Sequence, residues 1–353
     1  MISAKKWSIA FLVLVILLLI GLGSVTVIVD PYFHYHAPLE SLQYPIYSER
    51  YQNDGIVKHF DYDAIITGMS TAENFKASEF DELFGVHSVK VPYSAGSFRE
   101  INDNVLRAIE ANPGIKCILR GIDCGRLFET KDAISYDDLP AYLYDKHLYN
   151  DVYYVFNKEI LFTSTDRVFE YTDSGELTTD FDSYCNWAKW YDFGREAIEA
   201  VYERKTEKLE MAQMSEEEYE KMYGNVTQNI VDTVRDNPDI TFYLYFSPYN
   251  IYFWDNLNQY GSLEMQIEAQ KITTELLLQY DNVCVFSFFD DYDMICEPDN
   301  YKDTLHFTED INSRILYWIH DGEHQLTRDN YEKYYSDIKD YYVNYDYDGL
   351  WEN

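Results

Sequence analysis

The sequence predicts a three-layer α/β domain with a doubly wound parallel sheet, behind one N-terminal transmembrane helix. Short apolar runs typical of buried strands alternate with amphipathic runs typical of helices, which is the pattern of a parallel sheet covered on both faces. The 353 residues suffice for one large domain of this class after a membrane span. Hydrophobic residues make up 46% of the chain and aromatic residues 17%, which is enough for a substantial core.

The transmembrane helix is predicted from the first apolar run. From Trp7 to Val29 about 23 residues carry no charge, which is long enough to cross a hydrocarbon core of roughly 30 Å. Lys5 and Lys6 precede this run and the next basic residue is Arg50, so we expect a cytoplasmic N-terminus and an extracytoplasmic domain. A cleaved signal peptide would have a shorter apolar region and a small-residue cleavage site. We therefore expect an uncleaved, single-pass anchor in the cell membrane.

Strands and helices are expected to alternate after the anchor. The expected strands are at 63–68, 86–91, 115–119, 240–246 and 283–288, and the expected helices at 75–85, 98–111, 263–280 and 311–319. Gly85 is placed to end the first of these helices. Ser215 and Glu218 form a capping box that begins a charged helix toward Val234.

The predicted domain organisation has four parts, which are an anchor at 1–30, a juxtamembrane segment at 31–60, the α/β domain at 61–328 and an acidic, tyrosine-rich tail at 329–353. Residues 125–215 interrupt the strand–helix rhythm, and we expect them to form an insertion over the carboxyl edge of the sheet. Its Trp187 and Trp190 could stack on sugar rings, although ordinary packing is the favoured interpretation. For the tail we expect a peripheral helix or a partly disordered segment.

Charge and cysteine content narrow the functional class. The net charge of −34 argues against nucleic acid as a partner, and against general adhesion to anionic lipid or a teichoic-acid backbone, because such binding needs a basic surface. The five cysteines are an odd number and include no C-x-x-C pair, so we expect no disulfide framework, no bound metal and no cofactor. An exported domain with few disulfides suits a Gram-positive cell surface.

Two short segments far apart in the sequence fit one catalytic centre. Ser70 closes the first strand, where a serine is exposed as a nucleophile and its own N–H can lie near a helix N-terminus. His306 would take the serine proton, and Asp303 in the same loop would hold the imidazole. Gly96 follows the second strand, where a glycine lets a backbone N–H approach the substrate oxygen. The pattern predicts serine-dependent acyl transfer or ester cleavage.

These segments resemble the ordered blocks of the SGNH (GDSL-like) hydrolase superfamily, whose domain is a flavodoxin-like sheet. The blocks are Gly68-Met-Ser70, Gly96, Gly121-Ile-Asp123 and Asp303-x-x-His306, and the resemblance covers residues 60 to 325. With the anchor, the chain is similar to the DltD-like proteins of teichoic-acid D-alanylation and the AlgX-like proteins of polysaccharide acetylation. The resemblance implies a Ser70 nucleophile, a His306 base oriented by Asp303, and an oxyanion hole formed by the backbone of Ser70 and Gly96. It also implies cell-surface glycan or teichoic acid as substrate and a membrane-bound O-acyltransferase as partner.

Asp123 departs from the family pattern, which has an asparagine after the third strand as an oxyanion donor. An ionised carboxylate only accepts hydrogen bonds and would repel an oxyanion. Asp123 could be neutral through burial, or it could pair with Arg120 or Arg126 and be structural. The structural interpretation is favoured, and it puts the strength of the oxyanion hole in doubt.

Two other functions stay open. Asp123 would suit a non-catalytic partner of an O-acyltransferase that binds the polymer and positions it. His320, Glu323 and His324 fit the H-x-x-E-H pattern of a zinc hydrolase, which requires a continuous helix. Gly322 in the middle of this pattern weakens the zinc interpretation.

Overall fold

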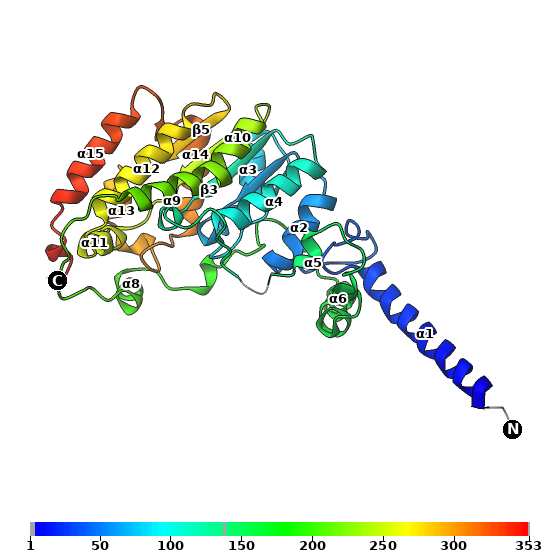
Figure 1. Cartoon of the computed structure of the whole chain (residues 1–353). Coiled ribbons are helices and arrows are strands. Elements are labelled where there is room, and N and C mark those ends of the chain that lie inside the picture. Colours follow the sequence, from blue (N-terminus) through cyan, green and yellow to red (C-terminus); the bar gives the residue numbers. More distant parts are fainter. Residues whose placement is uncertain (1–3, 137–138, 352–353) are drawn as a thin grey trace. The chain divides into compact units, whose positions relative to one another are not determined.

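The structure, a computed structural model, describes residues 4–136 and 139–351. The chain forms two compact units, whose elements are labelled in Figure 1. The anchor unit consists of Met1–Phe60 with Asp138–Asp180, and the sheet unit of Asp61–Asp137 with Phe181–Asn353. The middle of the predicted insertion therefore folds with the N-terminal segment, and its last part folds with the sheet.

The sheet unit is an α/β fold built on a mixed, mostly parallel sheet. Its strands are β1 Ala64–Thr67, β2 Ser88–Lys90, β3 Cys117–Ile122, β4 Thr241–Phe246, β5 Val283–Ser287 and β6 Gln325–Leu326. They lie in the order β2-β1-β3-β4-β5-β6. Strands β1 to β5 are parallel, whereas β6 is antiparallel to β5. The prediction of a purely parallel sheet is thus wrong at one edge, where a two-residue strand is too short to leave a sequence pattern.

The strand order creates a switch point between β1 and β3. After β1 the chain moves to β2 on one side, and it later enters β3 on the other side of β1. Loops at the carboxyl ends of β1 and β3 therefore diverge, and such a crevice is where ligands bind in open α/β sheets. Ser70 follows β1 and Asp123 follows β3.

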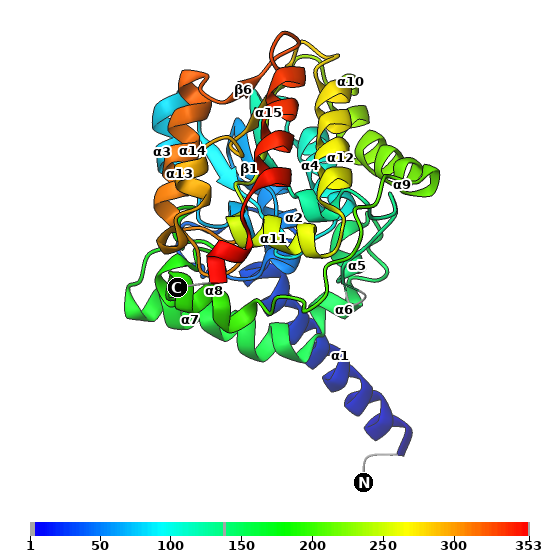
Figure 2. The same ribbon diagram turned by 90° about the vertical axis from the view of Figure 1, so that its left-hand side faces the viewer.

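The helices of the sheet unit form two packed groups. In one group α3 contacts α14, and in the other α12 contacts α9, α11 and α15, while α4 contacts α9. In Figure 2, α3 and α14 lie to one side of β1 and α4 and α12 to the other. The helices are α3 Ala77–Phe84, α4 Phe98–Ala111, α8 Arg195–Val201, α9 Glu216–Val226, α10 Asp232–Asp236, α11 Ile251–Gln259, α12 Leu263–Leu277, α13 Tyr292–Ile295, α14 Glu309–Asp321 and α15 Tyr331–Asn344. The short turns are η1 Ser70–Ala72, η2 Cys124–Arg126, η4 Ala188–Trp190, η5 Thr227–Val231, η6 Pro298–Asn300 and η7 Asp348–Trp351.

Local capping signals explain several helix boundaries. Helix α4 spans the predicted residues and begins at a capping box of Ser97 and Glu100. The predicted capping box of Ser215 and Glu218 is confirmed at the start of α9, and the helix continues through η5 to the end of α10. Gly85 ends α3 with a φ of 66°, as its position predicted.

The C-terminal segment forms a helix, which was one of the two expectations, and one face of α15 packs into the sheet unit. The Tyr342 ring is fully buried and stacks on Trp254 at 3.9 Å between ring centroids. Its hydroxyl donates to the Phe289 carbonyl oxygen at 2.7 Å. A tyrosine can enter a core when its hydroxyl finds such a partner, and the alternation of Tyr with Asp and Lys concealed this buried face.

The anchor unit is organised around α1, Ala4–Val29, which is long and apolar enough to span a membrane. Its other elements are α2 Glu49–His59, α5 Ala141–Tyr144, α6 Val152–Val155, the π-helical turn η3 Ile160–Ser164 and α7 Thr165–Ser174. Helix α1 contacts α6, η3 and α7. A small core of Tyr32, Leu143, Tyr154 and Ile160 joins the two parts of the unit.

The chain turns sharply where α1 ends, and one buried carboxylate holds the turn. Asp30 has a φ of 47° and accepts the backbone N–H groups of His34, Tyr35 and His36 at 2.7–3.0 Å. The Tyr154 hydroxyl donates to the same carboxylate at 2.6 Å. The juxtamembrane segment is therefore tied directly to α6.

Replacing Tyr342 by alanine tests whether α15 is part of the core. We expect the free energy of unfolding to fall by about 3–5 kcal/mol, because the change removes a buried aromatic ring and leaves a cavity beside Trp254. Urea denaturation followed by tryptophan fluorescence measures this loss. Tyr317→Ala, at an exposed tyrosine of α14, is the matched control and should change stability by less than about 0.5 kcal/mol. Equal effects of the two substitutions would contradict the buried position of α15.

Candidate active site

Glycine at the end of β1 lets the chain bring Ser70 to the switch point. Gly68 has a φ of 150°, and a Cβ at this position would lie 2.9 Å from the Ala72 Cβ and 3.3 Å from the Gly121 nitrogen. Any larger residue would push β1 away from β3. Ser70 then begins the three-residue turn η1, and its side chain is partly accessible to solvent.

The structure brings the three predicted catalytic residues together. The Ser70 Oγ lies 2.7 Å from the His306 Nε2, and the His306 Nδ1 lies 2.7 Å from the Asp303 Oδ2 and 2.9 Å from Oδ1. Because Nδ1 faces a carboxylate, the ring proton belongs there, and Nε2 is left to accept the serine proton. This is the order of contacts that activates a serine nucleophile.

The loop that carries Asp303 and His306 is a closed turn. Tyr301 and Phe307 form an antiparallel bridge, and the Lys302 N–H donates to the His306 carbonyl oxygen at 3.0 Å. The Asp303 Oδ1 accepts the N–H groups of Leu305 and His306, each at 2.8 Å. Asn250, the residue that caps the start of α11, donates from its side chain to the Asp303 carbonyl oxygen at 2.8 Å. These bonds fix the carboxylate before any substrate arrives.

Asp303 stays ionised in this setting. Burial alone would raise its pKa, but the hydrogen bond and charge of His306, the Lys302 ammonium and the Leu305 N–H together hold the pKa well below its ordinary value of 3.8. The Lys302 Nζ lies 2.8 Å from the Asp303 Oδ2. An ionised Asp303 keeps the imidazole in the tautomer that accepts from Ser70.

An aromatic wall covers one side of the histidine. The Trp187 ring meets the His306 ring edge to face at 5.2 Å, and its Nε1–H donates to the Ser70 carbonyl oxygen at 3.0 Å. The Lys302 Nζ lies over the rings of Trp187 and Tyr191 at 5.0 and 4.4 Å. Trp187, singled out in the sequence only as an insertion aromatic, thus contacts both Ser70 and His306, whereas Trp190 is exposed. Sequence reasoning missed Lys302 and Asn250, although Lys302 adjoins the D-x-x-H motif.

The two predicted oxyanion donors, the N–H groups of Ser70 and Gly96, differ in their hydrogen bonds. Among the described residues the Ser70 N–H has no hydrogen-bond acceptor, so it is free for a substrate oxygen. The Gly96 N–H, in contrast, donates to the Tyr93 carbonyl oxygen at 2.8 Å. A Cβ on Gly96 would lie 2.8 Å from the Tyr93 Cβ. The glycine is therefore explained by a tight turn, and the prediction that Gly96 is a second donor is wrong for this conformation.

Helix α3 does not support the oxyanion site as expected. The helix expected at 75–85 begins at Ala77, and only the turn η1 follows Ser70 directly. A single three-residue turn has little dipole, so the field at the Ser70 N–H comes from local groups.

Asp123 lies beside the site, directly after the end of β3. Burial raises its pKa, although Tyr249, the Gly125 N–H and the charges of Arg126 and His306 oppose this. The Gly125 N–H donates to Asp123 Oδ1 at 2.9 Å. The predicted pairing with arginine is wrong for the described residues. Arg126 binds Glu129 and the Ala95 carbonyl oxygen, while Arg120 binds Asn102 and two backbone oxygens.

The zinc interpretation does not fit the local structure. Helix α14 ends at Asp321, and Gly322 follows with a φ of 74°, so His320 and His324 do not share a helix face. His320 bonds to Asp321, and His324 bonds to Asp290. Within residues 4–136 and 139–351 no group of three His, Cys, Asp or Glu residues could hold a metal.

Comparison with protein-family models, with curated proteins and with solved structures gave no match to this chain. The SGNH resemblance therefore stays a prediction from the sequence blocks.

The depressed pKa of Asp303 makes a prediction about stability. A carboxylate with a lowered folded-state pKa stabilises the fold above its ordinary pKa, and this stabilisation is lost as the pH falls below about 4 toward the folded-state value. We therefore expect the stability advantage of the wild type over Asp303→Asn to be constant near neutral pH and to shrink below about pH 4. Denaturant titrations at a series of pH values measure it. An advantage that grows on acidification would contradict the assigned ionisation.

Proposed function

We propose that the chain is an extracytoplasmic, serine-dependent O-acyltransferase or esterase of the SGNH type. Its substrate would be a cell-surface polysaccharide or teichoic acid, and the transferred group an acetyl or D-alanyl group. The observation that carries the proposal is the continuous set of contacts from Ser70 through His306 to Asp303, with a 2.7 Å contact at each step.

The proposed reaction has two steps. The Ser70 Oγ attacks the acyl carbon while His306 Nε2 takes the hydroxyl proton, and the imidazolium is stabilised by ionised Asp303. The tetrahedral oxyanion forms near the Ser70 N–H, and its collapse expels the donor oxygen, which receives the proton from His306. A second hydroxyl then attacks the acyl-Ser70 ester and regenerates the serine. Water as the second nucleophile gives hydrolysis, and a sugar hydroxyl gives transfer.

The mostly parallel sheet and the apolar helix α1 support this proposal. The six-stranded order around the β1–β3 switch point is compatible with the three-layer, flavodoxin-like arrangement of SGNH domains, which we adopt as part of the proposal. Helix α1 would anchor the chain with its N-terminus in the cytoplasm. A membrane-bound O-acyltransferase is the proposed supplier of acyl groups, and a Gram-positive surface the proposed location.

The aromatic wall supports a sugar acceptor. Tyr191 is more than half exposed beside Trp187 and Lys302, and Trp190 is more exposed still. Exposed aromatic faces beside a charged group suit the apolar face and hydroxyl groups of a pyranose ring. An acceptor held there would lie next to His306, which must take its proton in the second step.

A non-catalytic polymer-binding partner is the second candidate. It is favoured by the engaged Gly96 amide and by an aspartate at position 123, since both leave the oxyanion with few donors. The two candidates differ in whether Ser70 reacts.

A fluorophosphonate probe distinguishes the two. We expect it to label the full chain in detergent, Ser70→Ala to abolish labelling, and Asp303→Asn to slow it on the order of 10⁴-fold, because the histidine tautomer is no longer fixed. Ser78→Ala, at an exposed serine of α3, is the matched control and should react at the wild-type rate. A folded wild type that stays unlabelled would favour the non-catalytic partner. Labelling that persists in Ser70→Ala would refute Ser70 as the nucleophile.

A further inference from the structure

The anchor unit exposes an unusual concentration of large apolar side chains outside α1. We call this set the α6 apolar surface, and it consists of Leu148, Tyr149, Val152, Tyr153, Phe156 and Phe162. Tyr153 is 66% and Phe162 62% exposed. A group of large, exposed apolar side chains marks a site that contacts a partner or a membrane.

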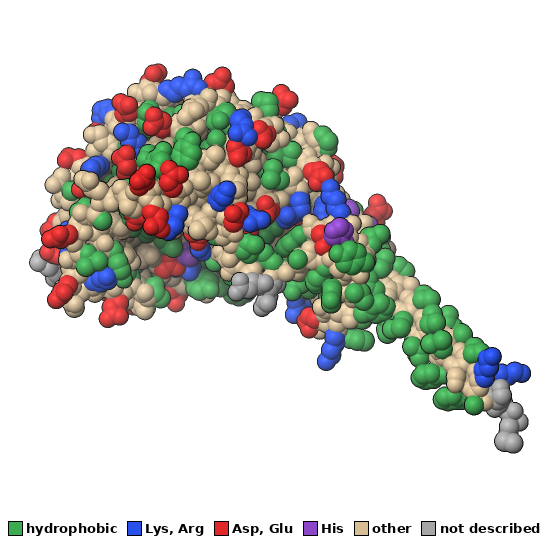
Figure 3. All heavy atoms as spheres, in the orientation of Figure 1, with side chains coloured by type: hydrophobic (Ala, Val, Ile, Leu, Met, Phe, Trp, Pro, Cys, Tyr) green, Lys and Arg blue, Asp and Glu red, His purple; other side chains and the backbone are tan. Residues whose placement is uncertain are grey.

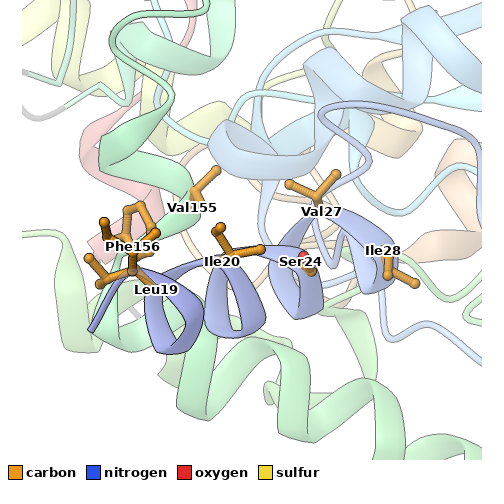
Figure 4. A pocket seen from close by; sticks show the side chains of 9 residues that line it. Leu19, Ile20, Ser24, Val27, Ile28, Val155 and Phe156 are labelled. Carbon is orange, nitrogen blue, oxygen red and sulfur yellow. The ribbon is translucent and has the colours of Figure 1, made fainter. Parts of the chain in front are cut away.

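This surface adjoins the apolar helix directly. Val155 and Phe156 line a groove of about 450 Å³ with residues 16–28 of α1, as Figure 4 shows. A Cβ on Gly23 would lie 3.0 Å from Val155 Cγ1 and 3.5 Å from Phe156 Cζ. The Thr26 hydroxyl donates to the Val155 carbonyl oxygen at 3.1 Å. The groove has no part in the chemistry of Ser70.

The depth of these contacts follows from helix geometry. A hydrocarbon core of roughly 30 Å, centred on the uncharged run of α1, covers about 20 of its residues at about 1.5 Å each. Gly23 lies about five residues from the centre of that run, so its neighbours Val155 and Phe156 would sit roughly 7 Å below the hydrocarbon boundary. Such a depth is typical of an interfacial helix, which enters the boundary by about 5–10 Å.

We propose that the α6–η3 segment, residues 148–162, inserts into the same membrane leaflet in which α1 ends, and that the α6 apolar surface contacts lipid acyl chains. This inference depends on α1 spanning a bilayer and is independent of the chemistry at Ser70.

The composition of the segment fits a shallow position. Tyr149 and Tyr153 are residues that favour the membrane–water boundary. Lys158 and Glu159 are exposed between α6 and η3, so the segment cannot cross the bilayer, but both charges can reach the headgroups. The backbone N–H groups of residues 153–157 all donate to carbonyl oxygens of residues 150–154, which is the internal pairing that a lipid-facing backbone needs.

The apolar surface of α1 continues onto residues 148–162. Figure 3 shows apolar side chains covering α1 from its charged start onward. Lipid that surrounds α1 at the level of Gly23 also reaches Phe156, because both line the same groove. Lipid acyl chains are therefore the occupant of the groove that we propose, because a bilayer spanned by α1 already supplies them. Attraction to anionic headgroups is not required, in keeping with the acidic composition of the chain.

Photo-crosslinking of the full chain in phosphatidylcholine vesicles tests the proposal. The vesicles carry a trace of phosphatidylcholine with a diazirine in its acyl chain, and peptide mass spectrometry locates the adducts. We expect adducts in α1 and in residues 148–162. The double substitution Phe156→Asp with Phe162→Asp should lower adducts in residues 148–162 several-fold and leave those in α1 unchanged. Both side chains are exposed, so the fold is retained, which circular dichroism checks.

Leu177→Asp is the matched control, because Leu177 is an 82% exposed apolar residue of the same unit outside the α6 apolar surface. Its adducts in residues 148–162 should equal those of the wild type. Adducts confined to α1 would overturn the proposal. Crosslinks from residues 148–162 to a second copy of the chain in place of lipid would also overturn it, and would assign the surface to self-association.

Discussion

The Asp303 carboxylate is the group on which the site depends. It accepts the Nδ1–H of His306, the backbone N–H groups of Leu305 and His306, and the Lys302 ammonium. All four donors come from the turn that carries the histidine, so the carboxylate both shapes the turn and sets the tautomer. Without it, the His306 Nε2 would have no fixed direction toward Ser70. The aromatic wall depends on it as well, because Lys302 reaches Trp187 and Tyr191 while bound to Asp303.

The sheet brings this turn to Ser70 across 236 positions of sequence. Ser70 follows a central strand, and the chain changes direction between β1 and β3, which leaves the carboxyl edge open there. Gly68 allows the close approach of β1 to β3, and the Trp187 Nε1–H holds the Ser70 carbonyl oxygen. Ser70 is thus positioned by backbone constraints, whereas His306 is positioned by side-chain hydrogen bonds.

Sequence patterns predicted the five parallel strands, the main helices and the meeting of Ser70, Asp303 and His306, because each leaves a local signal. A buried strand leaves an apolar run, and the D-x-x-H spacing places both groups in one turn. The contacts of Lys302 with Trp187 and Tyr191 and the buried face of α15 left no such signal, since both depend on residues distant in sequence. For Gly96 a sequence signal was present but was ambiguous. A glycine can serve a tight turn or a close substrate contact, and only the Tyr93 carbonyl contact separates the two. The grouping of residues 138–180 with the N-terminal segment likewise depends on distant contacts such as that of Tyr154 with Asp30.

Proton NMR of the His306 ring tests the central claim most directly, because it reports the Asp303–His306 hydrogen bond itself. The account predicts a far-downfield imidazole Nδ1–H resonance that survives Ser70→Ala, disappears in His306→Gln and moves upfield in Asp303→Asn. A wild-type spectrum without this resonance, or one in which Asp303→Asn leaves it unchanged, would contradict the account.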